Sequence, residues 1–532
     1  MRWAALMVAA VLTAAAGCSS GDAGAPVAAS KRPGEPNGAH GSSVPSGANG
    51  SNGSNGAEAP RPGGPQPNTA ALDVAAENAK PGTEDWKTGL RTDPTKSIEA
   101  YADRIAVRPG ETFRLFVSTT APGFTAKAYR MGWYGGNKGR EVWKSAHTPG
   151  RKQAEPVIDP GVNTVHADWD PSLTVPTTDW PEGSYLLLLT SDAGFSTYVP
   201  VTVRSGQTRG RTVLLNAVTT WQAYNEWGGY NLYNGPRDYS DRARIVSFDR
   251  PYDSTGAAGF LNMELPLIAV AERMGLPVAY ATDVDLDAEP KMFAGATAVI
   301  TLGHDEYWST AMREHATEAR DSGTNLAFLG ANAVNRHIRF GRTALGDRRL
   351  VICYKSAAED PMAADDPTET TQDWRLPPHS RPENVLTGTY YQCFPGNAPF
   401  VVWDADAWVF AGTGARRGTA YKGLVGVEYD RVVRDPAPPQ PIQVLSHSPV
   451  TCGGKADFAN ASYYTVPSGA GVFSTGTMRW VCALGTACGQ YLDEAGRRFA
   501  TQVTENVLRA FAAGPAGETY PARANFAEVA GP

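Results

Sequence analysis

The chain lacks the sequence signs of covalent hydrolytic catalysis. No Gly-x-Ser-x-Gly motif occurs in its 532 residues, so the nucleophile elbow of a serine hydrolase is absent. It has only six cysteines, and none lies where a predicted buried strand turns into a helix. A cysteine nucleophile therefore has no support either, and an activated water fits the sequence better.

Common metal motifs and a basic surface are missing as well. There is no His-x-x-x-His or Cys-x-x-Cys spacing, and Cys482 and Cys488 are too far apart for the second pattern. Lysine and arginine number 48 against 54 acidic residues, a net charge of −6. That balance gives no electrostatic footprint for nucleic acid. The acidic run 283–287 lacks the glycine and terminal glutamate of a calcium loop, so we interpret it as a strand end followed by a helix cap.

The N-terminus carries an export signal. Residues 1–17 are apolar and alanine-rich after Arg2, and they end in Ala-Ala-Gly before Cys18. A stretch this short is typical of a signal peptide rather than of a mature membrane span. Residues 15–18, Ala-Ala-Gly-Cys, resemble the lipobox of bacterial lipoproteins. This resemblance predicts lipidation of Cys18 and a protein anchored on the extracytoplasmic face of the cell membrane. An ordinary secretory signal cleaved near the same place is the alternative.

A tether follows the signal. Residues 18–75 are mainly Gly, Ser, Asn, Pro and Ala, with almost no large apolar side chain. Such a segment cannot bury enough surface to offset its ordering entropy, so we predict disorder. Its reach would be on the order of 40 Å.

Two folded domains are predicted after the tether. Residues 76–207 show short alternating runs with turn residues about every ten positions, which indicates an immunoglobulin-like β-sandwich. Residues 208–514 alternate predicted strands and helices, which is typical of an open parallel-sheet α/β domain. A final helix shows an apolar stripe at Phe499, Val503, Val507 and Phe511. Residues 515–532 are expected to form a frayed tail.

Polar residues follow several predicted strands of the α/β domain. Tyr224 follows the first strand, His304 and Glu306 follow the third, and Asn332 follows the fourth. Ligands bind at the carboxyl ends of the strands in open α/β sheets, so these groups should share one edge. Taken alone, His304 to Trp308 could equally be structural, with Asp305 or Ser309 capping the next helix.

The chain resembles the large (beta) subunit of N,N-dimethylformamidase and its relatives. The matching segments are 129–136, 220–229, 247–252, 303–308, 353–356 and 426–431. The resemblance implies a core like that of class I glutamine amidotransferases and a hydrolase that cleaves a carbon–nitrogen amide bond. It also implies one ferric ion per chain, held by Tyr224, Tyr252 and Glu306, with His304, Asn332 and Glu428 as essential outer residues.

Such a site is chemically sensible. A small trivalent cation prefers hard anionic oxygen donors. Its charge would allow phenols with an ordinary pKa near 10 to ionise. A bound cation of this kind can polarise an amide carbonyl and lower the pKa of a water. Glu428 or His304 suits the role of general base, and Asn332 could donate a hydrogen bond to the oxyanion.

Alternatives stay open at this point. The chain could be a non-catalytic surface lipoprotein that binds a ligand or a cell-wall polymer, or a hydrolase that uses zinc or manganese. The expected partners are a small amide substrate and the membrane, with no nucleic acid; a homo-oligomer stays open, and no small subunit is evident. Export also departs from the cytoplasmic setting expected of the amidase, which weakens the case for dimethylformamide itself.

The cysteines predict two disulfides in an oxidising compartment. With Cys18 lipidated, five remain, and we favour pairing Cys482 with Cys488 and Cys353 with Cys393. Cys452 would then be free.

Overall fold

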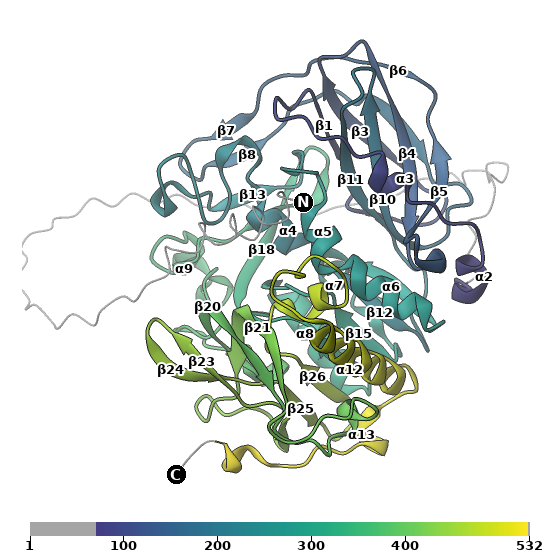
Figure 1. Cartoon of the computed structure of the whole chain (residues 1–532). Helices are drawn as coiled ribbons and strands as arrows, with labels where there is room; N and C mark the ends of the chain where they lie inside the picture. Colours follow the sequence, from purple (N-terminus) through teal and green to yellow (C-terminus); the bar gives the residue numbers. More distant parts are fainter. Residues whose placement is uncertain (1–70, 530–532) are drawn as a thin grey trace, which may run out of the picture.

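The computed structural model describes residues 71–529. The predicted signal peptide, Cys18 and nearly all of the predicted tether lie outside the described residues. In Figure 1 the strands coloured purple to blue fill the upper part of the molecule, and a larger sheet with helices α6, α8 and α12 fills the lower part. No helix between residues 71 and 529 combines the length and apolar character needed to cross a membrane.

The upper part consists of two main sheets that share one core. The first has the order β1-β3-β9 and the second the order β2-β11-β10-β4-β5. All pairings along these two paths are antiparallel except that of β2 with β11. The strands are β1 Ile98–Ala102, β2 Ala106–Val107, β3 Thr112–Thr119, β4 Gly123–Met131, β5 Gly139–Lys144, β9 Leu173–Pro176, β10 Gly183–Ser191 and β11 Ser196–Val203.

The alternating residues of these strands build that core. Phe113, Leu115 and Val117 of β3 belong to one buried cluster with Leu187 and Leu189 of β10. Side chains two residues apart point to the same face of a strand, so the pattern read from the sequence places them together. The last two strands of this part, β10 and β11, run antiparallel to each other.

The lower part is organised around a seven-stranded sheet. Its order is β14-β12-β15-β17-β26-β25-β22. The first five strands are parallel, and β25 and β22 add antiparallel pairings at one edge. The strands are β12 Thr212–Asn216, β14 Val278–Thr282, β15 Ala298–Thr301, β17 Asn325–Phe328, β22 Ile442–Val444, β25 Ser462–Thr465 and β26 Gly471–Ser474.

Helices cover both faces of this sheet. Leu214 and Ile300 point to the cluster that includes residues of α6 (Leu265–Arg273) and α12 (Glu494–Ala512). Val213 and Val299 point to the opposite cluster, with residues of α7 (Asp283–Ala288) and α8 (Thr310–Asp321). Covered faces explain why these strands are apolar throughout. The apolar stripe of the last helix lies buried on the sheet, as predicted.

Residues 258–273 form two helices rather than one. Helix α5 covers Ala258–Met263, and α6 starts at Leu265 with Pro266 in its first turn. Pro266 has no N–H to donate to the carbonyl four residues before it, and its ring clashes with that carbonyl, so a continuous helix cannot run through this point. The buried carboxylate of Glu264 lies at this break and accepts hydrogen bonds from Asn216 Nδ2, Ala217 N and Trp221 Nε1.

Buried charges join the two parts of the molecule. Arg130 of β4 and Glu272 of α6 form an ion pair of 2.6 Å with both side chains fully buried. Tyr134 donates to Glu77 at 2.7 Å and accepts a hydrogen bond from Arg130. The segment 131–136 is thus a structural corner.

One predicted disulfide is confirmed and the other is wrong. Cys482 bonds Cys488, but Cys393 bonds Cys452 and leaves Cys353 as a buried thiol. The reason is topological. Cys393 lies in β20 (Tyr390–Val401), which packs beside β23 (Ser448–Cys452), whereas Cys353 follows β19 (Gly346–Ile352) into a cluster with Tyr307.

The C-terminal residues up to 529 are packed rather than frayed. Asn525 accepts a hydrogen bond from Val444 N at 2.6 Å and donates one to Val444 O at 3.0 Å. It thereby satisfies both backbone groups of an edge residue of β22. The side chain completes the edge of the sheet, a role that composition alone did not indicate.

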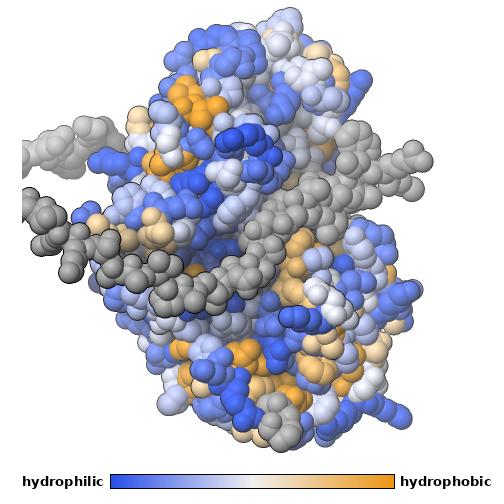
Figure 2. Space-filling view, turned by 90° about the vertical axis from the view of Figure 1, so that its left-hand side faces the viewer, coloured by the Kyte–Doolittle hydropathy of each residue, from blue (hydrophilic) through white to orange (hydrophobic). Residues whose placement is uncertain are grey.

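Large exposed apolar residues are scattered over the described surface. On the face in Figure 2, small orange areas are separated by blue ones. The exposed large residues are Val157, Ile158, Leu376, Val385, Phe458 and Tyr520. Isolated residues of this kind are normal for a protein surface and mark no docking face.

Two glycines let the loops after β15 and β17 touch. Gly303 has φ +91°, and a Cβ there would lie 2.6 Å from Met263 O. A Cβ on Gly330 would overlap the carbonyl oxygen of Gly303. Both positions therefore need glycine, one for its backbone conformation and both for close approach.

We predict that Gly330→Ala lowers the free energy of unfolding by about 1–3 kcal/mol, because the new methyl group meets backbone that cannot rotate away. Gly206→Ala is the matched control, since a Cβ there meets nothing within 4 Å. Denaturant unfolding of both variants measures the difference. Equal stability of the two variants would show that the loops can separate without cost.

Candidate functional site

The candidate site lies at the carboxyl ends of β12, β15 and β17. Helix α4 (Val218–Tyr224) follows β12 and carries Tyr224 at its end. The loop after β15 carries His304 and Glu306, and the turn after β17 carries Asn332. Glu428 comes from β21 (Ala420–Arg431), outside the main sheet. The expected edge of the sheet thus brings together groups that the sequence separates by up to about two hundred residues.

Two phenols and one carboxylate form the centre of the site. Tyr224 donates a hydrogen bond to Glu306 Oε2 at 2.8 Å, and Tyr233 lies 2.9 and 3.0 Å from the two oxygens of Glu306. The two phenol oxygens are 2.9 Å apart, and their rings stack with centroids at 4.7 Å. Four oxygen atoms of three side chains therefore converge on one point.

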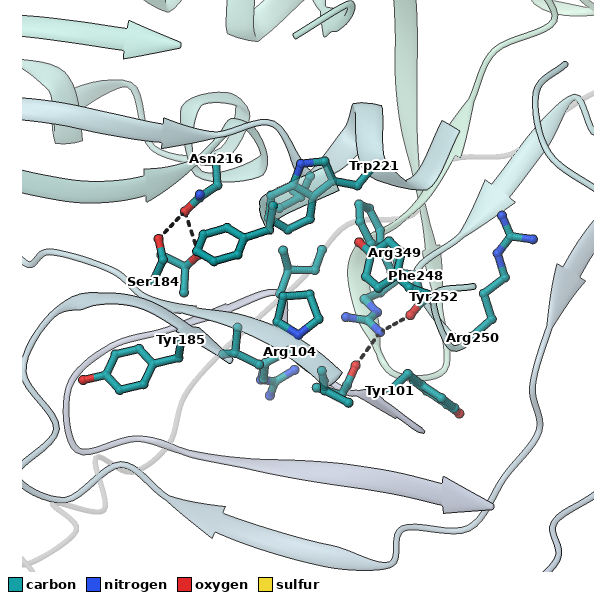
Figure 3. Close-up of a pocket in the computed structure, with 18 residues that line it drawn as sticks. Tyr101, Arg104, Ser184, Tyr185, Asn216, Trp221, Phe248, Arg250, Tyr252 and Arg349 are labelled. Atoms are coloured by element: carbon teal, nitrogen blue, oxygen red, sulfur yellow. Dashed lines mark hydrogen bonds between the residues drawn. The ribbon is translucent and has the colours of Figure 1, made fainter. Parts of the chain in front are cut away.

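Tyr252 is not part of this centre. Its ring packs against the edge of Trp221, with centroids 6.3 Å apart, and it lines a separate pocket (Figure 3). Tyr233, rather than Tyr252, supplies the second phenol that contacts Glu306. The sequence analysis missed Tyr233 because it lies in a loop rather than after a strand.

A local turn places Tyr233 in the site. Asn231 Oδ1 accepts hydrogen bonds from the backbone N–H groups of Tyr233 and Asn234, both at 2.7 Å. An asparagine that bonds the backbone two residues ahead is a turn signal that the sequence does contain. In a segment this rich in aromatic residues, however, that signal alone does not identify which tyrosine turns inward.

Two cations that the sequence analysis did not single out neighbour the centre. Arg336 Nε, from β18 (Arg336–Thr343), lies 3.1 Å from Glu306 Oε1. Lys355 Nζ lies 3.1 Å from the centroid of the Tyr233 ring. Both positive charges act on a carboxylate that has no exposure to solvent.

The electrostatics of the centre keep Glu306 ionised and the phenols neutral. Burial opposes ionisation of Glu306, but the hydrogen bond with His304 and the charges of Arg336, His304 and Lys355 outweigh it and hold its pKa well below the usual range. Burial and the negative charge of Glu306 raise the pKa of Tyr224 and of Tyr233 well above the ordinary value. Both phenols therefore act as hydrogen-bond donors to one carboxylate.

His304, Asn332 and Glu428 form a second group beside the centre. His304 Nε2 lies 3.3 Å from both Glu306 Oε2 and Tyr224 Oη. Burial opposes charge on the imidazole, but the hydrogen bond to Glu306 and the charge of Glu428 prevail and raise the pKa of His304 to about 9. Burial raises the pKa of Glu428 to about 7, against the lowering effect of His304 and of the Asn332 amide.

The turn that carries Asn332 is strained and tightly held. Asn332 and Val334 have φ of 60° and 57°, values that are uncommon for residues other than glycine. The turn is tied to the His304 loop by the Val334 N–H, which donates to Asp305 O at 3.0 Å. Asp430 Oδ1 accepts a hydrogen bond from Asn332 N at 2.8 Å. Strain of this kind clusters at functional sites.

Of the two residues considered as caps of the next helix, Ser309 has that role and Asp305 does not. Ser309 caps α8, because its side chain accepts a hydrogen bond from Met312 N. Asp305 instead accepts one from Trp308 Nε1 at 2.8 Å. His304 and Glu306 take part in neither contact, so they are free to face the centre.

The donor set at the centre suits a hard cation. Within residues 71–529 no group of three or more His, Cys, Asp or Glu side chains is arranged to hold a metal ion. The three oxygen-bearing side chains Tyr224, Tyr233 and Glu306 do converge, and such donors match a small, highly charged ion. Glu428 Oε2 and Asn332 Oδ1 are buried without a hydrogen-bond partner among the described residues. The centre and these two atoms together could take a cation and a polar ligand.

Comparison with known proteins identifies one family. The model of the family described as "N,N-dimethylformamidase beta subunit-like, C-terminal" matches residues 125–492, which is more than half of the chain. No curated protein matches the chain.

A comparison of structures adds nothing to this. The cycloisomaltooligosaccharide glucanotransferase of Paenibacillus sp., complexed with cycloisomaltoheptaose, matches at 8% sequence identity and a TM-score of 0.15. The match covers 52% of this chain and 37% of that chain. A likeness at this level carries no argument about fold or function.

We predict that Asp430 makes the protein less stable as the pH rises. Burial raises the pKa of Asp430 to about 7, outweighing the hydrogen bonds from Asn332 N and Thr389. The folded state then holds this proton more tightly than the unfolded state, so the free energy of unfolding should fall between about pH 4 and pH 7, by up to about 4 kcal/mol.

Asp430→Asn should remove this share of the pH dependence in denaturant unfolding measured from pH 4 to pH 8. Thr389→Val is the control, because it deletes one hydrogen bond to Asp430 and keeps the carboxyl group. Identical slopes for wild type and Asp430→Asn would contradict the prediction.

Proposed function

Because this chain belongs to the N,N-dimethylformamidase beta subunit-like family, we propose that it is a hydrolase of carbon–nitrogen amide bonds in small linear amides. The observation that carries the proposal is the pairing of two groups in one buried site. Tyr224, Tyr233 and Glu306 offer three oxygen-bearing side chains, and Glu428 with His304 offers proton acceptors and donors beside them.

We further propose that one ferric ion per chain binds Tyr224, Tyr233 and Glu306. Here Tyr233 replaces Tyr252 in the expected set, since its hydroxyl lies within 3.0 Å of both carboxylate oxygens. When bound, such an ion supplies Lewis acidity toward an amide carbonyl and toward water. Its charge also offsets the burial that otherwise keeps the two phenols protonated.

The side chains of the chain would handle the protons. Glu428 has a pKa near 7, so it is partly ionised at neutral pH and can take a proton from the attacking water. His304 is charged at neutral pH and can give a proton to the departing amine. Water oxygen would bond the carbonyl carbon as the C–N bond breaks, giving a carboxylic acid and an amine. Asn332 would hold Glu428 in place and donate to the developing oxyanion.

The remaining expectations stay with this proposal. They include export, anchoring of the membrane-tethered enzyme through a lipid on Cys18, and an immunoglobulin-like sandwich before a glutamine amidotransferase-like catalytic domain. The antiparallel sheets before residue 207 and the parallel sheet after residue 208 support that order of domains. Small formamides and acetamides are the substrate class to test first.

We predict that the purified protein is coloured, because phenolate bound to ferric iron absorbs visible light. Tyr224→Phe and Tyr233→Phe should each weaken or shift the band, and Glu306→Ala should lower the iron content, since each removes an oxygen donor. Tyr252→Phe is the matched control and should keep both band and iron. Absorption spectra with metal analysis give the answer.

Two other results would change the proposed ligands or the proposed metal. Loss of the band in Tyr252→Phe with an intact band in Tyr233→Phe would reverse our assignment. A colourless protein with stoichiometric zinc or manganese would replace iron in the proposal.

We predict that Glu428→Gln keeps the fold and the iron but loses turnover by about 10²–10⁴, the usual worth of a general base. Asn332→Ala should lose about 10²–10³. Rates on a panel of small amides measure both. Unchanged rates in both variants would refute these roles, and an iron-loaded wild type that cleaves no amide would favour the surface-binding alternative.

A further inference from the structure

A second pocket lies where the upper strands meet the lower sheet. It is lined by residues of β1, β10 and β11 on one side and of α4 and the segment 248–252 on the other (Figure 3). Trp221 separates this pocket from the tyrosine–glutamate centre. The Trp221 ring faces Tyr252, whereas Tyr224 on the same helix faces Glu306. The pocket is thus a different place from the tyrosine–glutamate centre.

Arginines and apolar side chains line this pocket, and of the arginines Arg250 turns its guanidinium away, to the carbonyl oxygens of Trp227, Tyr230 and Asn225. Arg104, Arg250 and Arg349 line it, and no Asp or Glu does so within the described part of the chain. The other walls are largely apolar: Ile105, Val199, Pro200, Val201, Val218 and Phe260. This distribution favours a ligand with one anionic group and a hydrocarbon body.

Arg349 has a hydrogen-bonding group to spare. Its side chain is 4% exposed, its Nε donates to Asp249 at 2.7 Å, and its Nη2 donates to Ala102 O and Phe248 O, both at 3.0 Å. Its Nη1 is buried without a hydrogen-bond partner among residues 71–529. Leaving a charged donor buried and unmade is costly, so this atom points to a missing acceptor.

Tyr252 can supply a second donor. Tyr252 and Arg349 both line the pocket and lie beside each other in Figure 3. No hydrogen bond to the Tyr252 hydroxyl occurs within the described residues. A guanidinium and a hydroxyl beside each other suit the two oxygens of a carboxylate.

The size of the pocket limits the ligand to a few heavy atoms. Its interior volume is about 30 Å³, whereas one water needs roughly 10–15 Å³ on the same measure. A sulfate or phosphate would turn several charged oxygens toward the valine side chains, which is unfavourable. A short hydrocarbon chain matches that wall instead.

We propose that this pocket is a binding site for a short-chain monocarboxylate of two or three carbons, held by Arg349 Nη1 and the Tyr252 hydroxyl. The hydrocarbon end would lie against Val199, Val218 and Phe260. The site stands on its own geometry and is independent of the hydrolase proposed above.

Titration calorimetry of the purified protein with propionate tests the proposal. Wild type should bind, and the neutral isostere 2-butanone, which has no amide bond to hydrolyse, should bind at least about 10-fold more weakly, since it loses a charge-assisted hydrogen bond. Tyr252→Phe should weaken propionate binding by about 10-fold. Arg349→Lys should weaken it by about 10-fold or more, because lysine lacks the planar fork of donors.

Two comparisons make the outcome decisive. Glu306→Gln should bind propionate like wild type, and loss of binding there would assign the ligand to the tyrosine–glutamate centre and overturn the proposal. Arg349 also contacts Ala102 O and Asp249, so Tyr252→Phe serves as the test if Arg349→Lys does not fold. Equal affinity of wild type and Tyr252→Phe for propionate, equal affinity of wild type for 2-butanone and propionate, or no binding of propionate by folded wild type would each refute the proposal.

Discussion

The candidate site depends on one buried carboxylate that stays ionised. Glu306 is removed from solvent, which by itself favours the protonated acid. Arg336 and His304 contact it directly, Lys355 lies close by, and two phenols donate to it. Without these contacts, burial would raise the pKa of Glu306 and the carboxylate would take up a proton. Every other group at the site is therefore arranged around the charge of Glu306.

The predicted order of strands and helices was enough to place some of the site residues together, but not all of them. Tyr224, His304, Glu306 and Asn332 were found because each follows an apolar strand, and parallel strands end at one edge. Tyr233 was missed because its place depends on the Asn231 turn within a loop. Arg336 and Glu428 come from strands outside the main sheet, which no periodicity in the sequence relates to it.

Contacts between distant segments also explain why the pairing of Cys393 and the packing of the C-terminal segment were predicted wrongly. A cysteine pairs with whatever cysteine the fold brings near, and the packing of β20 beside β23 is a contact between distant segments. The segment after residue 515 was expected to be a tail, yet Asn525 satisfies the backbone of β22. Local pattern predicted the elements well, whereas contacts between elements needed the three-dimensional structure.

The disulfide of Cys393 with Cys452 means that the two halves of the site, Glu428 and the tyrosine–glutamate centre, are held in place by different kinds of bond. Glu428 lies on β21, whose partner β20 is bonded covalently to β23, while helix α4 with Tyr224 and the loops with Tyr233 and Glu306 are held by noncovalent contacts. Reduction of this disulfide would therefore loosen the support of Glu428 and leave the contacts among Tyr224, Tyr233 and Glu306 in place.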